Sequence, residues 1–89
     1  MPKHFIYILE SANGKYYTGY TTDLERRMKQ HAHGTGSKFV RAFGFKALLY
    51  HEAHRTKSKA LKREAEIKKW SRKKKICLIT SHPKAQLQK

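Results

Sequence analysis

The stretch Tyr16–His31 constrains the fold more than any other part of this sequence. It begins with YYTGY, which is rich in aromatic and β-branched residues and predicts a short strand. Thr22 follows, with Glu25 three residues later, and together they fit a capping box at the start of a helix. We expect this helix to occupy residues 22–33 and to end at Gly34.

The predicted helix turns an unusual combination of side chains toward the interior. On a helical wheel Leu24, Met28 and His31 share one face, and Arg27 lies beside it. The residues expected to point away are Arg26, Lys29 and Gln30. A core that needs only packing would not place an arginine and a histidine beside a strand of tyrosines and glycine. This combination therefore marks a candidate functional site.

The rest of the chain predicts an α+β fold, in which helices flank a three-stranded antiparallel sheet in the order ββαβαα. Residues 4–10 form an expected strand that is apolar on both faces, as in a strand covered on two sides. The other expected elements are one helical turn at 37–41, a strand at 45–53, a helix from Thr56 or Ser58 to Trp70, and a helix at 72–80 capped by Ser71. We expect residues 1–80 to form one domain and 81–89 a disordered basic tail.

Charge is the strongest global signal. The chain of 89 residues has 21 Lys and Arg against 6 Asp and Glu, a net charge of +15. So positive a chain predicts a polyanionic partner, which is most often nucleic acid. A membrane surface is disfavoured, because no basic helix carries a broad apolar face with aromatic anchors. The basic residues expected to contact nucleic acid are Lys62, Arg63, Lys69, Arg72, Lys73, Lys74 and Lys75.

Other sequence features bound the class of protein. The apolar runs span only a few residues, far fewer than the roughly 20 that a membrane helix needs. The N-terminus lacks the apolar segment of a signal peptide, and the single cysteine, Cys77, excludes an internal disulfide. We therefore expect a cytoplasmic protein, and a monomer.

The helix at 56–70 carries a carboxylate among apolar residues. Its apolar side is expected to comprise Ala60, Leu61, Ala65 and Ile67. Glu64 lies in the middle of this side, whereas Glu66 points to solvent. A buried carboxylate is costly unless it is paired or bound to a metal. An ion pair with Lys68 and a role as metal ligand are equally open at this point.

Histidine pairs raise the alternative of a zinc site. The sequence contains His31-x-His33 and His51-x-x-His54. Strand alternation would put His51 and His54 on opposite faces, so zinc is disfavoured.

In their order and spacing these residues resemble the GIY-YIG nuclease superfamily. The matching residues are Ile6-Tyr7, Tyr17-Thr18-Gly19, Arg27, His31 and Glu64. The stretches YTGYTTDLERRMKQH and ALKREAEIKKWSRKKK are most similar to its small stand-alone bacterial members (YhbQ/YazA-like), and the similarity covers residues 4 to about 79. Two positions depart from the name motifs: Phe5 replaces the first glycine, and Thr18 replaces the central isoleucine of the second motif.

The resemblance implies a GIY-YIG fold and metal-dependent hydrolysis of DNA, structure-selective or weakly sequence-specific, as in DNA repair. Glu64 would be the only carboxylate on one Mg²⁺ or Mn²⁺. Arg27 would hold the phosphate, and Tyr17 would act as general base with Tyr7 and His31 positioning it. The alternatives are a non-catalytic, basic nucleic-acid-binding accessory protein and a factor associated with RNA or the ribosome, with DNA favoured over RNA.

These roles require Tyr7 and Tyr17 to lie on the same face of the sheet. Whether they do depends on the length of the turn at Asn13-Gly14, which is a strong hairpin signal. A two-residue turn would pair Tyr7 with Tyr20 and put Tyr7 and Tyr17 on opposite faces of the sheet. A three-residue loop or a bulge would put both tyrosines on one face. We predict the longer loop or the bulge.

Overall fold

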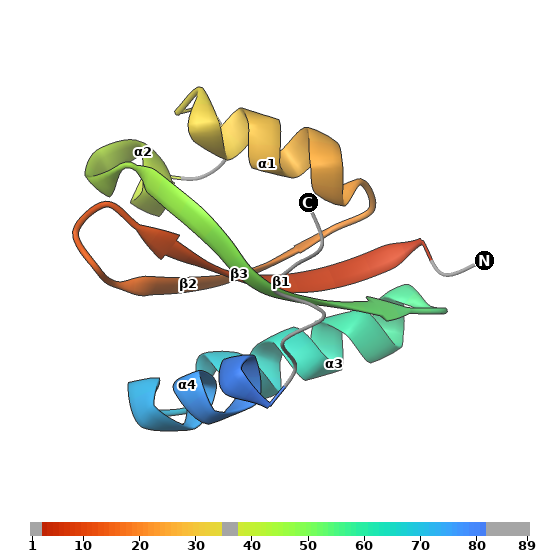
Figure 1. The fold of residues 1–89 in the computed structure, drawn as a ribbon. Coiled ribbons are helices and arrows are strands. Elements are labelled where there is room, and N and C mark those ends of the chain that lie inside the picture. The colour runs from red at the N-terminus through yellow and green to blue at the C-terminus, as the bar shows by residue number, and fades with distance from the viewer. Residues whose placement is uncertain (1–2, 35–37, 82–89) are drawn as a thin grey trace.

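The computed structural model describes residues 3–34 and 38–81, which form an antiparallel sheet between two layers of helices (Figure 1). The strands are β1 (His4–Ser11), β2 (Tyr16–Thr21) and β3 (Phe45–His54), in the spatial order β2-β1-β3. One face carries α1 (Leu24–Ala32) and α2 (Lys38–Phe43), and the other carries α3 (Lys57–Lys68) and α4 (Arg72–Thr80).

This architecture confirms the predicted α+β class, with the element order ββααβαα. The helical turn expected at 37–41 is a helix in its own right, α2, so the order has one more helix than predicted. The tail expected at 81–89 lies outside the described residues except for Ser81. No helix within the described ranges is long and apolar enough to span a bilayer.

The central strand β1 is buried on both faces, as its sequence predicts. Ile6, Tyr7, Ile8 and Leu9 are each at most 2% exposed. Ile6 and Ile8 face α3 and α4, whereas Tyr7 and Leu9 face α1 and α2. Each face of the sheet thus has its own core, and burial of each large aliphatic side chain contributes roughly 1.5–3 kcal/mol.

The turn between β1 and β2 is a three-residue loop, which confirms the longer of the two alternatives. Ser11 N donates to the Lys15 carbonyl at 2.8 Å, and residues 12–14 form the loop between them. Gly14 adopts a φ of 85°, a value that a residue with a side chain rarely takes. In this register Leu9 lies opposite Tyr17, so Tyr7 and Tyr17 share the face toward α1.

The helix caps follow prediction at two helices and differ at one. Thr56 caps α3 and Ser71 caps α4, each through a side-chain oxygen that accepts a backbone N–H. The prediction of Thr22 as the cap of α1 was wrong. Asp23 is the cap, with an extended backbone and a carboxylate that accepts from Arg26 N at 3.1 Å. Asp caps at least as well as Thr, and the helix therefore starts one residue later.

The buried side of α3 is narrower than predicted. Ala60 and Ile67 are fully buried, but Leu61 is 38% exposed and Ala65 is also exposed, so their assignment to the apolar side was wrong. The sheet contacts a line through positions 60 and 67. Positions 61 and 65 are rotated away from this line, because each residue advances by about 100° around the helix.

Arg63 beside this line ties α3 to β3. Its Nε and Nη2 donate to the Glu52 carboxylate at 3.0–3.2 Å, and its Nη1 donates to Glu66 at 2.7 Å. The guanidinium also lies 5.1 Å from the centre of the Trp70 ring. Burial opposes ionisation of Glu52, but hydrogen bonds from Arg63, Tyr50 and His54 lower its pKa.

We expect Arg63→Ala to lower the free energy of unfolding by about 2 kcal/mol, because the partly buried Glu52 carboxylate would lose its cation. Urea denaturation at neutral pH measures this loss. Lys62→Ala is the matched control, since Lys62 is the exposed neighbour on α3 and should change stability by less than about 0.5 kcal/mol. Equal effects of the two variants would contradict a stabilising role for Arg63.

Candidate active site

Three aromatic side chains from β1, β2 and α1 meet on the α1 face of the sheet. The Tyr7 hydroxyl lies 2.8 Å from His31 Nε2, and both side chains are buried. The Tyr17 ring centre lies 6.3 Å from that of Tyr7 and 5.8 Å from that of His31. The fold thus brings together three of the five side chains expected at the catalytic site.

Gly19 provides the space for this cluster. It lies directly opposite Tyr7 in the sheet, so both residues face the same side. A Cβ atom at Gly19 would lie 2.5 Å from the Tyr7 hydroxyl oxygen and 3.0 Å from Cε2 of Tyr17. The Tyr7 phenol therefore extends across β2 at the one position where that strand has no side chain.

Burial keeps Tyr7 and His31 uncharged at neutral pH. Burial and the nearby Arg27 charge lower the pKa of His31 to about 4, so its imidazole is neutral at neutral pH. Burial raises the pKa of Tyr7, as do the charges of Tyr17 and Glu64, while Arg27 opposes them. Nδ1 of His31 has no hydrogen-bond partner among the described residues, and its ring stacks 6.4 Å from Phe45.

The other two expected site residues, Arg27 and Glu64, belong to different elements. Their charges influence the Tyr7 phenol in opposite directions, because Arg27 lowers its pKa and Glu64 raises it. Arg27 is half-buried on α1. Glu64 is on α3, across the sheet, and its side chain is 17% exposed. Arg63 and Glu64 flank the buried line of α3 on opposite sides. Because Arg63 turns toward β3, Glu64 turns toward β2.

Glu64 also forms the ion pair that the sequence left open. Lys68 Nζ lies 3.3 Å from its Oε2, one helical turn away. On α4, burial and the nearby positive charge of Lys68 lower the pKa of Lys75. The carboxylate is therefore paired with one lysine of α3, and a lysine of α4 lies near that partner.

The donor set around Glu64 limits which metal this site suits. Within residues 3–34 and 38–81, no three His, Cys, Asp or Glu side chains gather as a cluster that could hold an ion. One carboxylate suits a hard cation that retains water ligands and takes phosphate oxygens, as Mg²⁺ and Mn²⁺ do. Of the histidines considered for zinc, His54 contacts Glu52 at 3.0 Å and His51 lies on the other face of β3.

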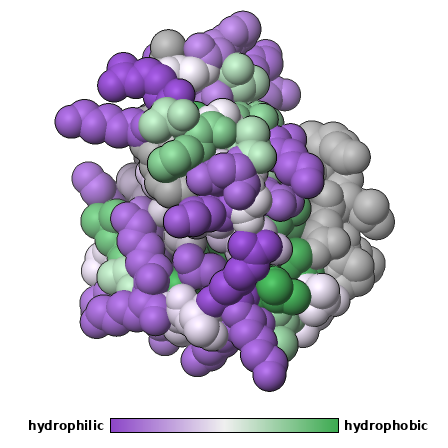
Figure 2. All heavy atoms as spheres, turned by 90° about the vertical axis from the view of Figure 1, so that its left-hand side faces the viewer, coloured by the Kyte–Doolittle hydropathy of each residue, from purple (hydrophilic) through white to green (hydrophobic). Residues whose placement is uncertain are grey.

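The seven residues expected to contact nucleic acid differ in how open they are, and Lys75 is half-buried on α4. Lys62, Lys69, Lys73 and Lys74 are exposed on α3, α4 and the segment between them. Arg63 is occupied by Glu52 and Glu66, and Arg72 donates to the Gly14 carbonyl at 2.6 Å. Figure 2 shows the side that includes α4 largely covered by hydrophilic side chains, with small hydrophobic areas between them. The exposed lysines are thus the open part of the basic surface.

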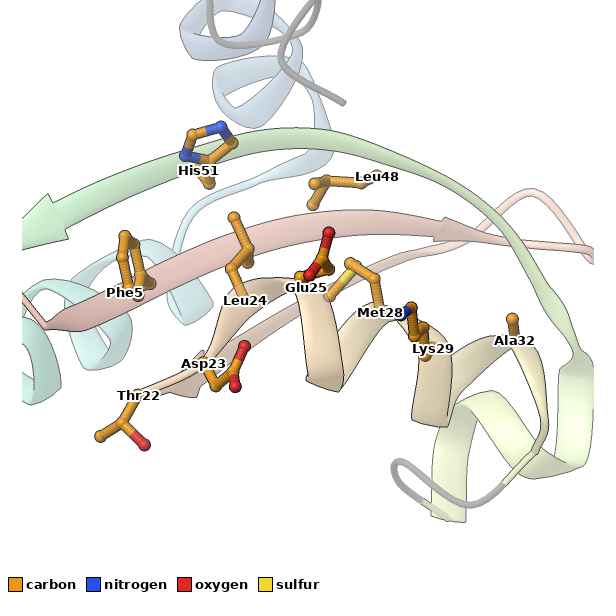
Figure 3. Close-up of a pocket in the computed structure, with 10 residues that line it drawn as sticks. All are labelled: Phe5, Thr22, Asp23, Leu24, Glu25, Met28, Lys29, Ala32, Leu48 and His51. Carbon is orange, nitrogen blue, oxygen red and sulfur yellow. The ribbon is translucent and has the colours of Figure 1, made fainter.

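A separate pocket of about 590 Å³ lies between α1 and strands β1 and β3. Leu24 and Met28 of α1 point toward Leu48 of β3 there, and Phe5 lies at one end (Figure 3). The pocket contains none of the expected catalytic residues. Phe5, which replaces a motif glycine, lines this pocket and not the tyrosine cluster.

Sequence reasoning missed two features near the site. Arg26 and Gln30, expected to point away, line a polar pocket together with Arg27. Their i,i+4 spacing was the available signal. Thr18, which replaces a motif isoleucine, is buried on the α3 face, and its hydroxyl has no hydrogen-bond partner in the described part of the chain.

Comparison with known proteins identifies the class to which this fold and site belong. Residues 3–76 match the family of the GIY-YIG catalytic domain, and the chain belongs to this family. Within it, the chain groups with the small bacterial UPF0213 proteins. It is 48% identical over 80 residues to a UPF0213 protein of Staphylococcus saprophyticus, covering 90% of this chain and 98% of that protein.

Two further relatives agree with this assignment. A UPF0213 protein of Staphylococcus aureus is 44% identical over 79 residues, covering 89% of this chain and 96% of that protein. The solution NMR structure of a UPF0213 protein from Bacillus halodurans is similar with a TM-score of 0.57 at 45% identity, covering 86% of this chain and 82% of that chain. The recognition of a GIY-YIG fold from sequence is thus confirmed.

The neutral state of His31 predicts a pH dependence of stability. The folded pKa of about 4 is below the ordinary value of 6.5, so the unfolded chain binds the proton first as pH falls. The stabilisation is fully present above pH 6.5 and is lost toward pH 4, by roughly 3 kcal/mol. Urea denaturation across this range should show the loss in the wild type but not in His31→Gln. Parallel curves would contradict the prediction.

We expect Gly19→Ala to displace Tyr7 and Tyr17 and to lower stability by about 1–3 kcal/mol through overpacking. NMR signals of the His31 ring report whether its hydrogen bond to Tyr7 survives. In a Tyr7→Ala background the main clash is absent, so the same change at Gly19 should cost far less. An equal penalty in both backgrounds would show that the Tyr7 phenol does not require the glycine.

Proposed function

We propose that this protein is a divalent-metal-dependent endonuclease that hydrolyses phosphodiester bonds in DNA, structure-selective or weakly sequence-specific. The observation that carries the proposal is the cluster of Tyr7, Tyr17 and His31 beside Gly19, which the charges of Arg27 and Glu64 influence. Tyr7, Tyr17 and His31 are in contact, and the charges of Arg27 and Glu64 act on the Tyr7 phenol. Membership of the GIY-YIG catalytic-domain family supports the same chemistry.

The exposures of the two tyrosines support different roles for them in this proposal. Tyr17 is half-buried and can reach water and substrate, whereas Tyr7 is 2% exposed. In this proposal Tyr17 is the general base that accepts the proton of the attacking water. Tyr7 stays neutral, because burial raises its pKa, and it positions Tyr17 through ring contact. His31 fixes Tyr7 by their hydrogen bond.

The charged residues would handle the phosphate. Arg27 would offset the negative charge that develops on the phosphate oxygens in the transition state. Glu64 would hold the Mg²⁺ or Mn²⁺ ion and would exchange part of its pairing with Lys68 for it. A bound divalent ion supplies Lewis-acid stabilisation of the leaving oxygen. The oxygen of the attacking water bonds to phosphorus, and the opposite P–O ester bond breaks.

A second candidate is a non-catalytic nucleic-acid-binding accessory protein, and the Lys68 contact favours it. Glu64 already has a cationic partner 3.3 Å away and can be stable without a metal. The exposed lysines of α3 and α4 would bind phosphates in either case. The two candidates therefore differ only in whether Glu64 supports turnover.

Glu64→Gln distinguishes these candidates, because it keeps the shape of the side chain and removes its charge. If Glu64 holds the metal, cleavage with Mg²⁺ or Mn²⁺ should fall by at least about 100-fold while folding and DNA binding are retained. The assay uses linear, single-stranded, flapped and branched DNA. Mn²⁺ should broaden NMR signals near Tyr17 in the wild type but not in the variant.

Glu66→Gln is the matched control on the same helix, since Glu66 is exposed and pairs at the surface with Arg63. It should leave cleavage unchanged. Wild-type protein that binds DNA but cuts none of these substrates with either metal would establish the accessory function instead.

A further inference from the structure

A polar pocket of about 220 Å³ lies where β2 leads into α1. The side chains and backbone around it belong to Thr21, Thr22, Asp23, Arg26, Arg27 and Gln30. It is on the opposite flank of α1 from the apolar pocket of Figure 3, whose helical lining is Leu24, Glu25, Met28, Lys29 and Ala32. One flank of the helix is thus cationic and the other largely apolar.

Helix geometry explains why two arginines share this pocket. Arg26 and Gln30 are one turn apart, and Arg27 is three residues before Gln30, so all three line one flank. The helical wheel predicted that only Arg27 faces the site. Arg26, at the preceding position of the helix, also lines this pocket.

The donor set of the pocket suits an oxyanion. Two arginines and a glutamine line the pocket together with one carboxylate, that of Asp23, whose Oδ1 accepts the backbone N–H of Arg26 as the cap of α1. No ion pair within the described ranges occupies the Arg26 guanidinium, which is exposed. A guanidinium presents paired donors that match phosphate oxygens.

Arg27 connects this pocket to the tyrosine cluster. It lines the pocket, and its charge also acts on Tyr7 and His31. An anion in the pocket would therefore lie next to the group on which the cluster acts. Successive phosphates of one nucleic-acid strand lie next to each other in the same way.

We propose that this pocket binds the phosphodiester next to the one that is cleaved, with Arg26 as its specific contact. The proposal rests on the nuclease function above and defines its substrate as a strand with at least two successive phosphodiesters. A dinucleoside monophosphate, with a single phosphodiester, would fill only half of the site.

The test is a double-mutant cycle between protein and DNA. Each phosphate of a cleavable oligonucleotide is replaced in turn by an uncharged methylphosphonate. At one position beside the scissile bond, the replacement should weaken wild-type binding and kcat/KM by roughly tenfold, as should Arg26→Ala on unmodified DNA. The two changes together should be no worse than either alone, because they remove one contact.

Two variants serve as controls. Lys29→Ala, on the other flank of α1, should be additive with every methylphosphonate. Asp23→Asn keeps a capping side chain and removes the opposing charge, so it should tighten binding through the pocket. Arg26→Ala should also reduce the slope of log K against log salt by about one.

Because Glu64→Gln is expected to bind DNA without cleaving it, the binding of this variant tests the pocket independently of the nuclease function. Cleavage by the wild type with additive effects of Arg26→Ala at every position would overturn the pocket and leave the nuclease in place. Binding that is coupled between Arg26 and one phosphate, without cleavage of any substrate, would support the pocket as a phosphate site and reject the nuclease function.

Discussion

The three-residue turn between β1 and β2 is the constraint on which the site depends. It places Tyr7 opposite Gly19 and Leu9 opposite Tyr17, and so puts both tyrosines on the face toward α1. A turn one residue shorter would move one tyrosine to the α3 face, where Ile6 and Ile8 form the other core. The positions of the two tyrosines are thus fixed by backbone hydrogen bonds at the end of the sheet.

Adjacent residues of α3 serve opposite edges of the sheet. Arg63 turns toward β3 and closes an ion pair with Glu52, whereas Glu64 lies on the opposite side of the buried line, where its charge raises the pKa of Tyr7 across the sheet. Both flank the same buried line through Ala60 and Ile67. The helix therefore anchors itself on one side and presents a carboxylate on the other, and its packing fixes where that carboxylate lies.

Local sequence signals predicted most of the fold and failed where two signals competed. The apolar pattern of β1 and the cap at Ser71 are properties of a few neighbouring residues and were predicted, and Thr56 was one of the two caps expected for α3. At α1, Thr22 and Asp23 can both cap, and only the backbone conformation decides between them. Pairing of Arg63 with Glu52 involves residues 11 apart on different elements, which periodicity does not encode. The sequence therefore could not predict which charged residues form ion pairs within the protein and which remain open to a ligand.

The contact of Arg72 with the Gly14 carbonyl joins residues 58 apart and places the start of α4 over the first turn of the chain. The same guanidinium lies 4.5 Å from the centre of the Tyr16 ring, next to Tyr17. Closing so long a loop costs more conformational entropy than closing the local hairpin. We therefore expect the hairpin to set its register early and α4 to dock on it only after the rest of the chain has assembled.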